Sequence, residues 1–481
     1  MHPACEGHPQ ITWLSPGMQF VQTCPVVSPE PVICGDTGAD GSGAQLYGSV
    51  VRDGGLFRLW YTAFPREWDG RNSSSRVACV ESDDGLLWRK PRHGVMPCAG
   101  STDNHLTDLL FLSPSVFIEP GAPPSMRFRA FGWYHHPQRG WASHTAFSAD
   151  GIKWSVEPEP LYQSADGITS VWNPYTNSAL VMVERSRYVR GVPRRCWFSS
   201  EWTRKGATAP VSALVPDEFD DVAAVSRGFN SGDYYGMGLM PTPGPVVGFL
   251  WHFRHQLPLL STTRNQFGNF GRIDISLVYQ LDRGGKWMHF PGRPDWLTPE
   301  RMPDWARGCL FTASSPIEVG DETWLYFTGD AHRHGWFLDY QWKVDPKLKA
   351  MVDPGGFARI GLAKWPKDRL LGYRAPLLER LELAPRAGAA SRLVLNVVTR
   401  PDGVVRVALV NRRDGKAMAG FDFEDSVPIC GDHRQAVVRW RGQGSWPAVT
   451  QGPPPAAQIE IAKGTLYAFD FVLEGIAGGS T

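Results

Sequence analysis

Short apolar stretches alternate with tight polar turns along most of the chain. Residues 46–51 follow a period of two, and an Asp-Gly turn joins them to an aromatic-rich run at 56–62. Residues 76–81 form a third run and enter the turn Ser82-Asp83-Asp84-Gly85, which closes on Trp88. Runs with a period of two that are joined by such turns are typical of antiparallel strands in hairpins. The pattern predicts an all-β chain.

The turn that closes on tryptophan occurs three times. Residues 148–154 repeat it after a strand at 142–147, and residues 281–287 repeat it after a strand at 273–279. Groups of short strands fill about residues 41–378, in five units of roughly 60–70 residues. Because one such unit cannot bury its own apolar face, neighbouring units must stack around a common centre. The repeats therefore predict a five-bladed β-propeller.

The two ends of the chain differ from these repeats. Residues 1–40 are rich in proline and glycine and lack a periodic pattern, which indicates an extended segment leading into the repeats. Residues 379–390 are rich in Ala, Arg and Leu, and short strands with tight turns follow them. We expect residues 379–481 to form a small antiparallel β-sandwich.

Composition narrows the possible functions. The 481 residues carry a formal net charge of +1 without a long basic run, so nucleic-acid binding is not expected. Because an apolar segment of about 18 residues is missing, we expect neither a transmembrane helix nor a membrane partner. The N-terminus lacks the features of a secretory signal, unless a leader has been removed. The eight cysteines are scattered, which favours free thiols in the cytoplasm and no metal or other cofactor.

Several motifs resemble those of the five-bladed propeller glycoside hydrolases, broadly families 32, 43 and 68 and their uncharacterised relatives. They are Tyr47-Gly48-Ser49-Val50, the turns ending at Trp88 and Trp154, and residues 57–61, 114–117, 233–237, 320–327 and 359–363. The resemblance covers most of the chain. It implies a glycosidase, here an exo-acting hydrolase of a small oligosaccharide or glycoside. Its substrate would occupy a funnel lined by the innermost strand of each blade.

The same resemblance implies three carboxylates at the starts of the first three inner strands. Glycoside hydrolysis needs one group to protonate the departing oxygen and another to attack or to activate water. One of the two must hold its proton near neutral pH. By position, the second unit offers Asp108, with Asp103 as its alternate. The third offers Asp166, with Glu184 as a weaker choice.

The first unit departs from the family pattern. Its inner strand begins at Gln45, where the family has an Asp, and the nearest acid is Asp40 in the preceding loop. The fourth unit offers Asp221 or Asp233 instead. We therefore expect the catalytic carboxylates to be Asp108 and Asp166, with Asp40 or Asp221 as the third.

Further residues near these strand starts are candidates for contacts with the sugar. Arginine can bind sugar hydroxyls or a sugar carboxylate, and tryptophan can stack on a sugar ring. The candidates are Asp103, Asn104, Arg127, His135, Trp172, Glu184, Arg185, Asp233 and His252. The acids Asp53, Asp84 and Asp150 are expected to be turn residues that accept backbone N–H bonds.

Two other functions fit the same pattern. The missing Asp in the first unit is compatible with a propeller that binds carbohydrate without cleaving it. A sugar lyase would need a His or Tyr base and an arginine that neutralises a uronate, which His135 or His136 with Arg127 would supply. A carbohydrate is the expected partner in each case, whereas the oligomeric state is not predicted.

Overall fold

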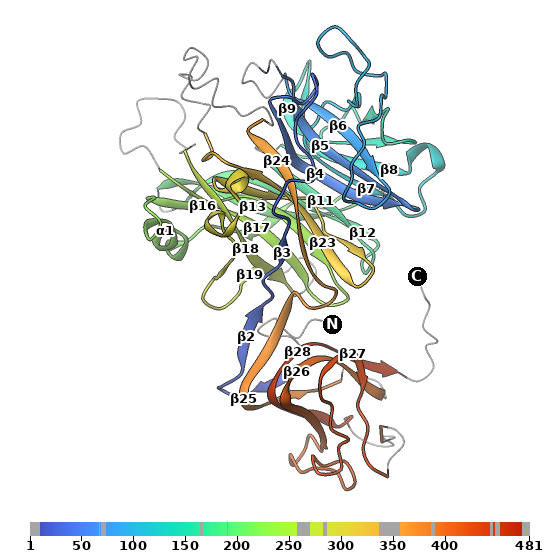
Figure 1. Ribbon diagram of the computed structural model, residues 1–481, viewed down its shortest axis with the longest axis vertical. Helices are drawn as coiled ribbons and strands as arrows, with labels where there is room; N and C mark the ends of the chain where they lie inside the picture. Colours follow the sequence, from blue (N-terminus) through green and yellow to red (C-terminus); the bar gives the residue numbers. More distant parts are fainter. Residues whose placement is uncertain are drawn as a thin grey trace. The chain divides into compact units, whose positions relative to one another are not determined.

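Most of the described chain is β-strand, which confirms the predicted all-β class (Figure 1). The computed structural model describes residues 10–66, 68, 74–163, 167–189, 191–256, 270–281, 286–335, 356–385, 390–442, 446–447 and 453–473. The chain forms two compact units. Unit 1 comprises Met1–Cys24, Thr242–Pro245 and Trp365–Thr481, and unit 2 comprises Pro25–Pro241 and Val246–Lys364.

Unit 2 consists of antiparallel sheets that follow one another along the chain. The first three have the strand orders β4-β5-β6, β10-β9-β8-β7 and β11-β12-β13-β14, with β15 beside β13. Their strands are β4 (Gly43–Asp53), β5 (Leu56–Phe64), β6 (Arg76–Ser82), β7 (Leu112–Ile118), β8 (Phe128–His136), β9 (Gly140–Ser148), β10 (Ser155–Val156), β11 (Ile168–Asn173), β12 (Ser178–Val189), β13 (Val192–Thr203), β14 (Gly206–Ala207) and β15 (Val211–Leu214).

A larger sheet completes unit 2, in the order β16-β17-β18-β21-β23-β24-β3. The parallel pair Ile273 and Cys309 joins its two halves, so β16-β17-β18 and β21-β23-β24-β3 are separate antiparallel groups. The strands are β16 (Ser231–Pro241), β17 (Val246–His255), β18 (Gly271–Gln280), β19 (Trp287–His289), β20 (Asp295–Leu297), β21 (Cys309–Thr312), β22 (Ile317–Val319), β23 (Glu322–Asp330), β24 (Ala358–Pro366) and β3 (Val26–Val27).

The first strands of these five groups contact one another in a closed circuit, from β4 to β7, β11, β16, β21 and back to β4. Serine hydroxyls bridge them. Ser49 Oγ accepts the Val116 N–H at 2.7 Å, and Ser115 Oγ accepts the Ser170 N–H at 3.1 Å. Ser49 Oγ also lies 2.5 Å from Ser314 Oγ, just beyond β21. Small hydroxyl side chains let the inner strands approach closely while satisfying their backbone donors.

The turn that begins at Ser82 is fixed by its own side chains, and so is the turn that begins at Ser148. Asp84 Oδ1 accepts two backbone N–H groups at 2.8 and 2.9 Å, and Ser82 Oγ accepts the Gly85 N–H at 2.9 Å. Asp150 repeats these bonds in the second turn. Both acids are turn residues, as the sequence predicted.

The glycines of these turns also dock on the neighbouring sheet. Gly85 and Gly151 have φ angles of +74° and +75°, which favour glycine. The Gly85 carbonyl accepts the Tyr326 hydroxyl at 2.7 Å, and the Gly151 carbonyl accepts Trp60 Nε1 at 2.8 Å. A Cβ atom on Gly151 would lie 2.6 Å from the Trp60 ring. The third predicted turn, 281–287, lies partly outside the described residues.

Helical structure is confined to short segments in the described part of the chain. They are α1 (Glu218–Val225), η2 (Pro124–Met126), η3 (Pro299–Arg301) and η4 (Asp304–Ala306). A capping box starts α1: Asp217 accepts the Phe219 N–H, and Asp220 accepts the Asp217 N–H at 2.9 Å. None of the described helices is long and apolar enough to cross a membrane.

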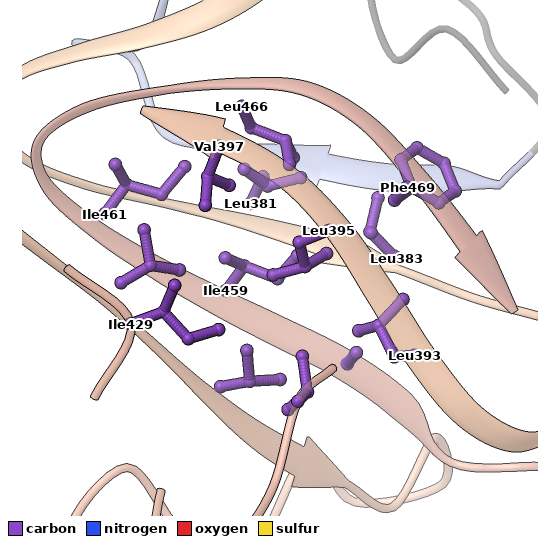
Figure 2. Packing of buried hydrophobic residues seen from close by; sticks show 14 of the residues in the cluster. Leu381, Leu383, Leu393, Leu395, Val397, Ile429, Ile459, Ile461, Leu466 and Phe469 are labelled. Carbon is purple, nitrogen blue, oxygen red and sulfur yellow. The ribbon is translucent and has the colours of Figure 1, made fainter. Parts of the chain in front are cut away.

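Unit 1 is a six-stranded antiparallel sheet in the order β1-β25-β28-β26-β27, with β2 beside β25. Its strands are β1 (Ile11–Leu14), β2 (Gln19–Gln22), β25 (Leu371–Leu383), β26 (Ala390–Val410), β27 (Asp432–Val437) and β28 (Ala456–Leu473). Figure 2 shows Leu395, Ile459 and Leu381 in the apolar cluster of this unit. Since β1 and β2 belong to this sheet, part of the N-terminal segment packs with the C-terminal region.

Candidate active site

Two tyrosines meet where the first strands of the sheets converge. The ring centroids of Tyr47 on β4 and Tyr235 on β16 lie 6.5 Å apart with nearly parallel planes. Tyr47 also stacks on Trp251 at 5.5 Å and meets Phe311 edge-on at 5.0 Å. Trp251 and Phe311 are buried, whereas both tyrosines are partly exposed. Partly exposed aromatic rings with a polar edge are suited to contact sugars.

Backbone irregularities set the direction of these tyrosines. The pairing of β4 with β5 shifts between Gln45 and Ser49, and that of β16 with β17 shifts between Tyr234 and Gly236. Each shift encloses one of the two tyrosines. Bulges of this kind re-aim a side chain and are common next to active sites.

Tyr235 connects the aromatic pair to charged groups. Its hydroxyl lies 3.0 Å from His334 Nε2, and the Arg195 guanidinium carbon lies 5.0 Å from its ring centroid. Arg195 pairs with Glu184 at 3.2 Å. The Glu184 N–H donates to the Gly167 carbonyl at 2.9 Å, which holds this acid at the start of β11. A carboxylate, a guanidinium and a histidine therefore gather beside the two tyrosines.

The preceding residue, Arg194, organises a second carboxylate group. Its Nε donates to Asp233 at 2.6 Å, and its two terminal nitrogens bind Asp221 at 3.1 and 3.0 Å. His255 Nε2 lies 3.0 Å from the other Asp233 oxygen. Burial alone would raise the pKa of Asp233, but His255 and Arg194 outweigh it and lower that pKa. The Asp221 side chain is 37% exposed, so it is the accessible member of this group.

Asp220, the neighbour of Asp221 in α1, is buried in a different environment. Its Oδ2 accepts the Tyr234 hydroxyl at 2.6 Å, and its Oδ1 lies 3.5 Å from His252 Nε2. Burial raises the pKa of Asp220 to about 6. Burial also lowers the pKa of His252 well below its usual value. His252 thus faces the Asp220 carboxyl, and the sugar contact predicted for it stays a prediction.

Asp40 is buried at the start of the first sheet. Its carboxylate accepts bonds from the Thr37 N–H and hydroxyl, from the Tyr61 hydroxyl at 2.7 Å and from Lys90 Nζ at 2.6 Å. His105 Nε2 lies 3.4 Å from the same oxygen as Lys90. Burial would raise the pKa of Asp40, but His105 and Lys90 hold it well below its usual range.

The two acids that the sequence placed first have different outcomes. Asp108 Oδ1 accepts the Trp154 N–H at 2.8 Å, at the end of the second tryptophan turn. Burial raises the pKa of Asp108. Asp166 lies outside the described residues, directly before Gly167. The contact of Asp108 does not test its catalytic role, and the catalytic roles of Asp108 and Asp166 both stay predictions.

The other predicted binding residues are spread over several places. Arg127 binds Asp53 and covers the Phe128 ring. His135 is exposed on β8 with its ring 5.1 Å from that of Trp141. The remaining contacts are those of Asp103 with Arg92 at 3.1 Å, Asn104 with the Met96 and Ser101 carbonyls, and Trp172 with Phe117 at 6.0 Å. Glu184, Arg185 and Asp233, in contrast, belong to one region around the β12–β13 hairpin.

Sequence analysis missed Arg194, Arg195, Asp220 and His334 as parts of this region. One signal was present: Arg194 and Arg195 are consecutive in a strand whose neighbours are apolar. Side chains at successive strand positions point to opposite faces, so a buried pair needs acids on both sides. For His334 the sequence carries no such signal, because its partner Tyr235 is 99 residues away.

Metal ligands do not cluster in the described part of the chain: no group of three His, Cys, Asp or Glu side chains is placed to hold an ion. The cysteines among the described residues are free thiols.

Several solved structures are similar to this chain at low identity. A thermostable family-43 glycoside hydrolase shares 10% identity with a TM-score of 0.40, covering 68% of this chain and 88% of its own. An α-L-arabinofuranosidase from Podospora anserina in complex with cellotriose shares 9% at 0.42, covering 72% and 98%. A GH62 hydrolase in complex with xylotriose shares 10% at 0.39, with the same coverage.

These structures are glycoside hydrolases, the enzyme class whose motifs the sequence resembles. No protein-family profile matches the chain, and no curated protein matches it. At such identities and TM-scores the likeness carries no weight for this chain, and the function proposed below rests on the chain's own residues.

Proposed function

We propose that unit 2 is a five-bladed β-propeller with the activity of an exo-acting glycoside hydrolase on a small oligosaccharide or glycoside. The closed circuit of first strands, β4, β7, β11, β16 and β21, supports five blades. We propose in addition that unit 1 is the β-sandwich predicted at the C-terminus, extended by β1 and β2.

The catalytic carboxylates of this proposal are Glu184 and Asp221. The observation that carries it is that consecutive arginines of β13 bind both acids and that both arginines also contact β16. Arg195 binds Glu184 and lies over Tyr235, and Arg194 binds Asp221 and Asp233. The aromatic pair Tyr47 and Tyr235 adjoins Arg195 and would stack on the sugar.

The exposure of the two acids divides their roles. Asp221 is the more accessible, so it is the group that can meet and activate water. Glu184 adjoins, through Arg195, the ring cluster that would hold the sugar, so we assign it the contact with the departing oxygen. Asp108, with its raised pKa, and Asp166 remain the alternative pair.

Turnover of a panel of chromogenic glycosides by single variants tests this assignment. Glu184→Gln and Asp221→Asn should each reduce kcat by at least about 100-fold, the usual contribution of an acid–base group. Glu159→Gln is the matched control, since Glu159 is an exposed acid that pairs with Arg139. If both variants keep activity within about threefold of the wild type, the assignment is wrong. Loss in Asp108→Asn alone would favour the alternative pair.

A sugar lyase is a second candidate, favoured by the Tyr235–His334 pair beside Arg195. A tyrosine or histidine can remove the proton next to a uronate carboxylate, and an arginine can neutralise that carboxylate. A lyase would release an unsaturated product that absorbs in the ultraviolet, and Tyr235→Phe would abolish it. Sugar-dependent thermal shifts without any product would instead indicate a binding protein.

A further inference from the structure

Arginines on the β12–β13 hairpin fall into two groups. Arg194 and Arg195 are each bound to carboxylates. Arg185 and Arg187 are not: within the described residues, no acid lies within ion-pair distance of either guanidinium. Both instead lie over one ring, that of Phe198, with guanidinium carbons 5.4 and 4.3 Å from its centroid.

The register of the hairpin places these two cations on one face. Arg185 pairs with Cys196 and Arg187 pairs with Arg194 across the strands, and residues two apart share a face of a strand. Arg187 is exposed and Arg185 is partly exposed, although Arg185 Nε is buried without a hydrogen-bond partner. Among the described residues, the exposed guanidinium of Arg187 is therefore the part of this pair that a ligand can reach most directly.

A second ring of unit 2, that of Phe128, also lies beneath two arginines, Arg58 and Arg127, but both of these pair with Asp53. Elsewhere in unit 2, a buried arginine such as Arg129 covers the Trp202 ring while binding Glu119 and Glu157. Two guanidiniums without an anion repel each other, and a neutral ring offsets only part of that repulsion. With an anion bound between them, Arg185 and Arg187 would contact both a ring and a negative charge, as Arg129 does.

The pair also adjoins the proposed catalytic group. Arg187 lies opposite Arg194, which holds Asp221 and Asp233. Arg185 and Glu184 are successive in β12, so their side chains leave the strand on opposite faces. A charged substituent held by Arg185 and Arg187 would therefore lie on the side of the hairpin where Arg194 holds Asp221, one of the two proposed catalytic acids.

We propose that Arg185 and Arg187 bind an anionic group of the substrate, so that the substrate is an acidic oligosaccharide. Guanidinium groups bind carboxylate or sulfate oxygens through paired N–H donors. The inference deepens the proposed function by naming its substrate class.

Calorimetric titration of the full chain measures this preference without requiring turnover. The probes are oligogalacturonates with their methyl-esterified counterparts, which lack the charge, and sulfated oligosaccharides with their desulfated counterparts. At low salt, at least one acidic probe should bind at least about tenfold more tightly than its neutral counterpart. The difference should shrink as salt rises. The first pair of probes reports a carboxylate and the second reports a sulfate.

The variant Arg185→Gln/Arg187→Gln should bind the acidic and neutral probes of a pair equally. Arg139→Gln, at an exposed arginine paired with Glu159, should keep the wild-type preference. Thermal unfolding shows that both variants fold; if the double variant does not, Arg187→Gln alone, at the exposed position, is expected to reduce the preference. The proposal is overturned if no acidic probe is preferred, or if the preference survives the loss of the arginines.

These outcomes separate the inference from the proposed hydrolase. Turnover of neutral glycosides without any preference for acidic probes would sink the inference alone. A preference for acidic probes that depends on Arg185 and Arg187, without cleavage of any probe, would sink only the hydrolase.

Discussion

Two buried aspartates of unit 2 have nearly the same neighbours and opposite protonation behaviour. Asp40 accepts the Tyr61 hydroxyl at 2.7 Å, and Asp220 accepts the Tyr234 hydroxyl at 2.6 Å. Each tyrosine hydroxyl lies 2.9 Å from a histidine Nε2, that of His105 for Tyr61 and that of His289 for Tyr234. The pKa of Asp40 is nevertheless held low, whereas that of Asp220 is raised to about 6.

The two pKa values differ because the two carboxyl groups have different cationic partners and accept different numbers of hydrogen bonds. Lys90 donates directly to Asp40, which also accepts two bonds from Thr37. Arg293 lies 3.2 Å from Asp220, but both of its terminal nitrogens donate to Asp217. Burial therefore raises the pKa of Asp220, because fewer donors and cations stabilise its charged form. An Asp–Tyr–His arrangement by itself does not decide the charge of its carboxyl.

Replacing Asp40 should give the largest loss of stability. Asp40→Asn leaves Lys90, a mostly buried cation, with the exposed Asp36 carboxylate in place of its buried partner, and breaking a buried pair costs about 3–5 kcal/mol. The stabilisation by Asp40 is present above its unfolded pKa of about 4 and is lost as pH falls. Urea unfolding at pH 7 measures the change. A loss below about 1 kcal/mol would mean that Lys90 does not depend on Asp40.

Replacing Asp220 should have the opposite pH dependence. Its folded pKa of about 6 exceeds the unfolded value of about 4, so the stabilisation is full below pH 4 and is lost as pH rises through 6. Over that range the contribution of Asp220 to the free energy of unfolding should fall by about 3 kcal/mol, because each pKa unit corresponds to about 1.4 kcal/mol. Asp220→Asn should remove that loss.

Unfolding free energies of the wild type and Asp220→Asn at pH 4.5 and pH 8 provide the comparison, with the exposed Glu159→Gln as control. The variant should gain stability relative to the wild type between the two pH values. An equal difference at both values would contradict the raised pKa of Asp220.

Replacing Tyr61 and Tyr234 should change the free energy of unfolding by smaller amounts. At pH 5 Tyr61 donates to a charged carboxylate and Tyr234 to a carboxyl that is largely neutral. Hydrogen bonds to charged groups contribute more, so Tyr61→Phe should cost about 2 kcal/mol and Tyr234→Phe about 1 kcal/mol. Tyr234→Phe should also raise the pKa of Asp220 further, because that hydrogen bond lowers it. NMR titration of the Asp220 carboxyl would detect the shift, and an unchanged pKa would contradict it.

The local parts of this fold could be predicted from the sequence, and the long-range parts could not. The turns at Ser82 and Ser148 are fixed within seven residues, so their motif reveals them. Helix α1 was missed because its cap, Asp217 with Asp220, lies in a segment whose acids suggest a polar loop. The sequence predicts short strands with tight turns after residue 390, whereas residues 390–410 form one long strand, β26, with an irregularity between Thr399 and Val404.

The site shows the same division. Asp40 was correctly located before the first inner strand, but its charge depends on Lys90 and His105, which are 50 and 65 residues away. Periodicity cannot reveal such partners. Glu184 ranked below Asp166 in the sequence, since only the folded chain brings it beside Arg195 and the start of β11.

Proton NMR of oligosaccharide cleavage tests the central claim, hydrolysis at the Glu184 region, most directly. Full-length wild type, incubated with the acidic and neutral probes described above, should produce new reducing-end signals. Each cleavage should add one water and leave no unsaturated sugar. Glu184→Gln, with unchanged thermal unfolding, should abolish these signals. The account is contradicted if the wild type releases no new reducing ends from any probe, or if Glu184→Gln releases them at the wild-type rate.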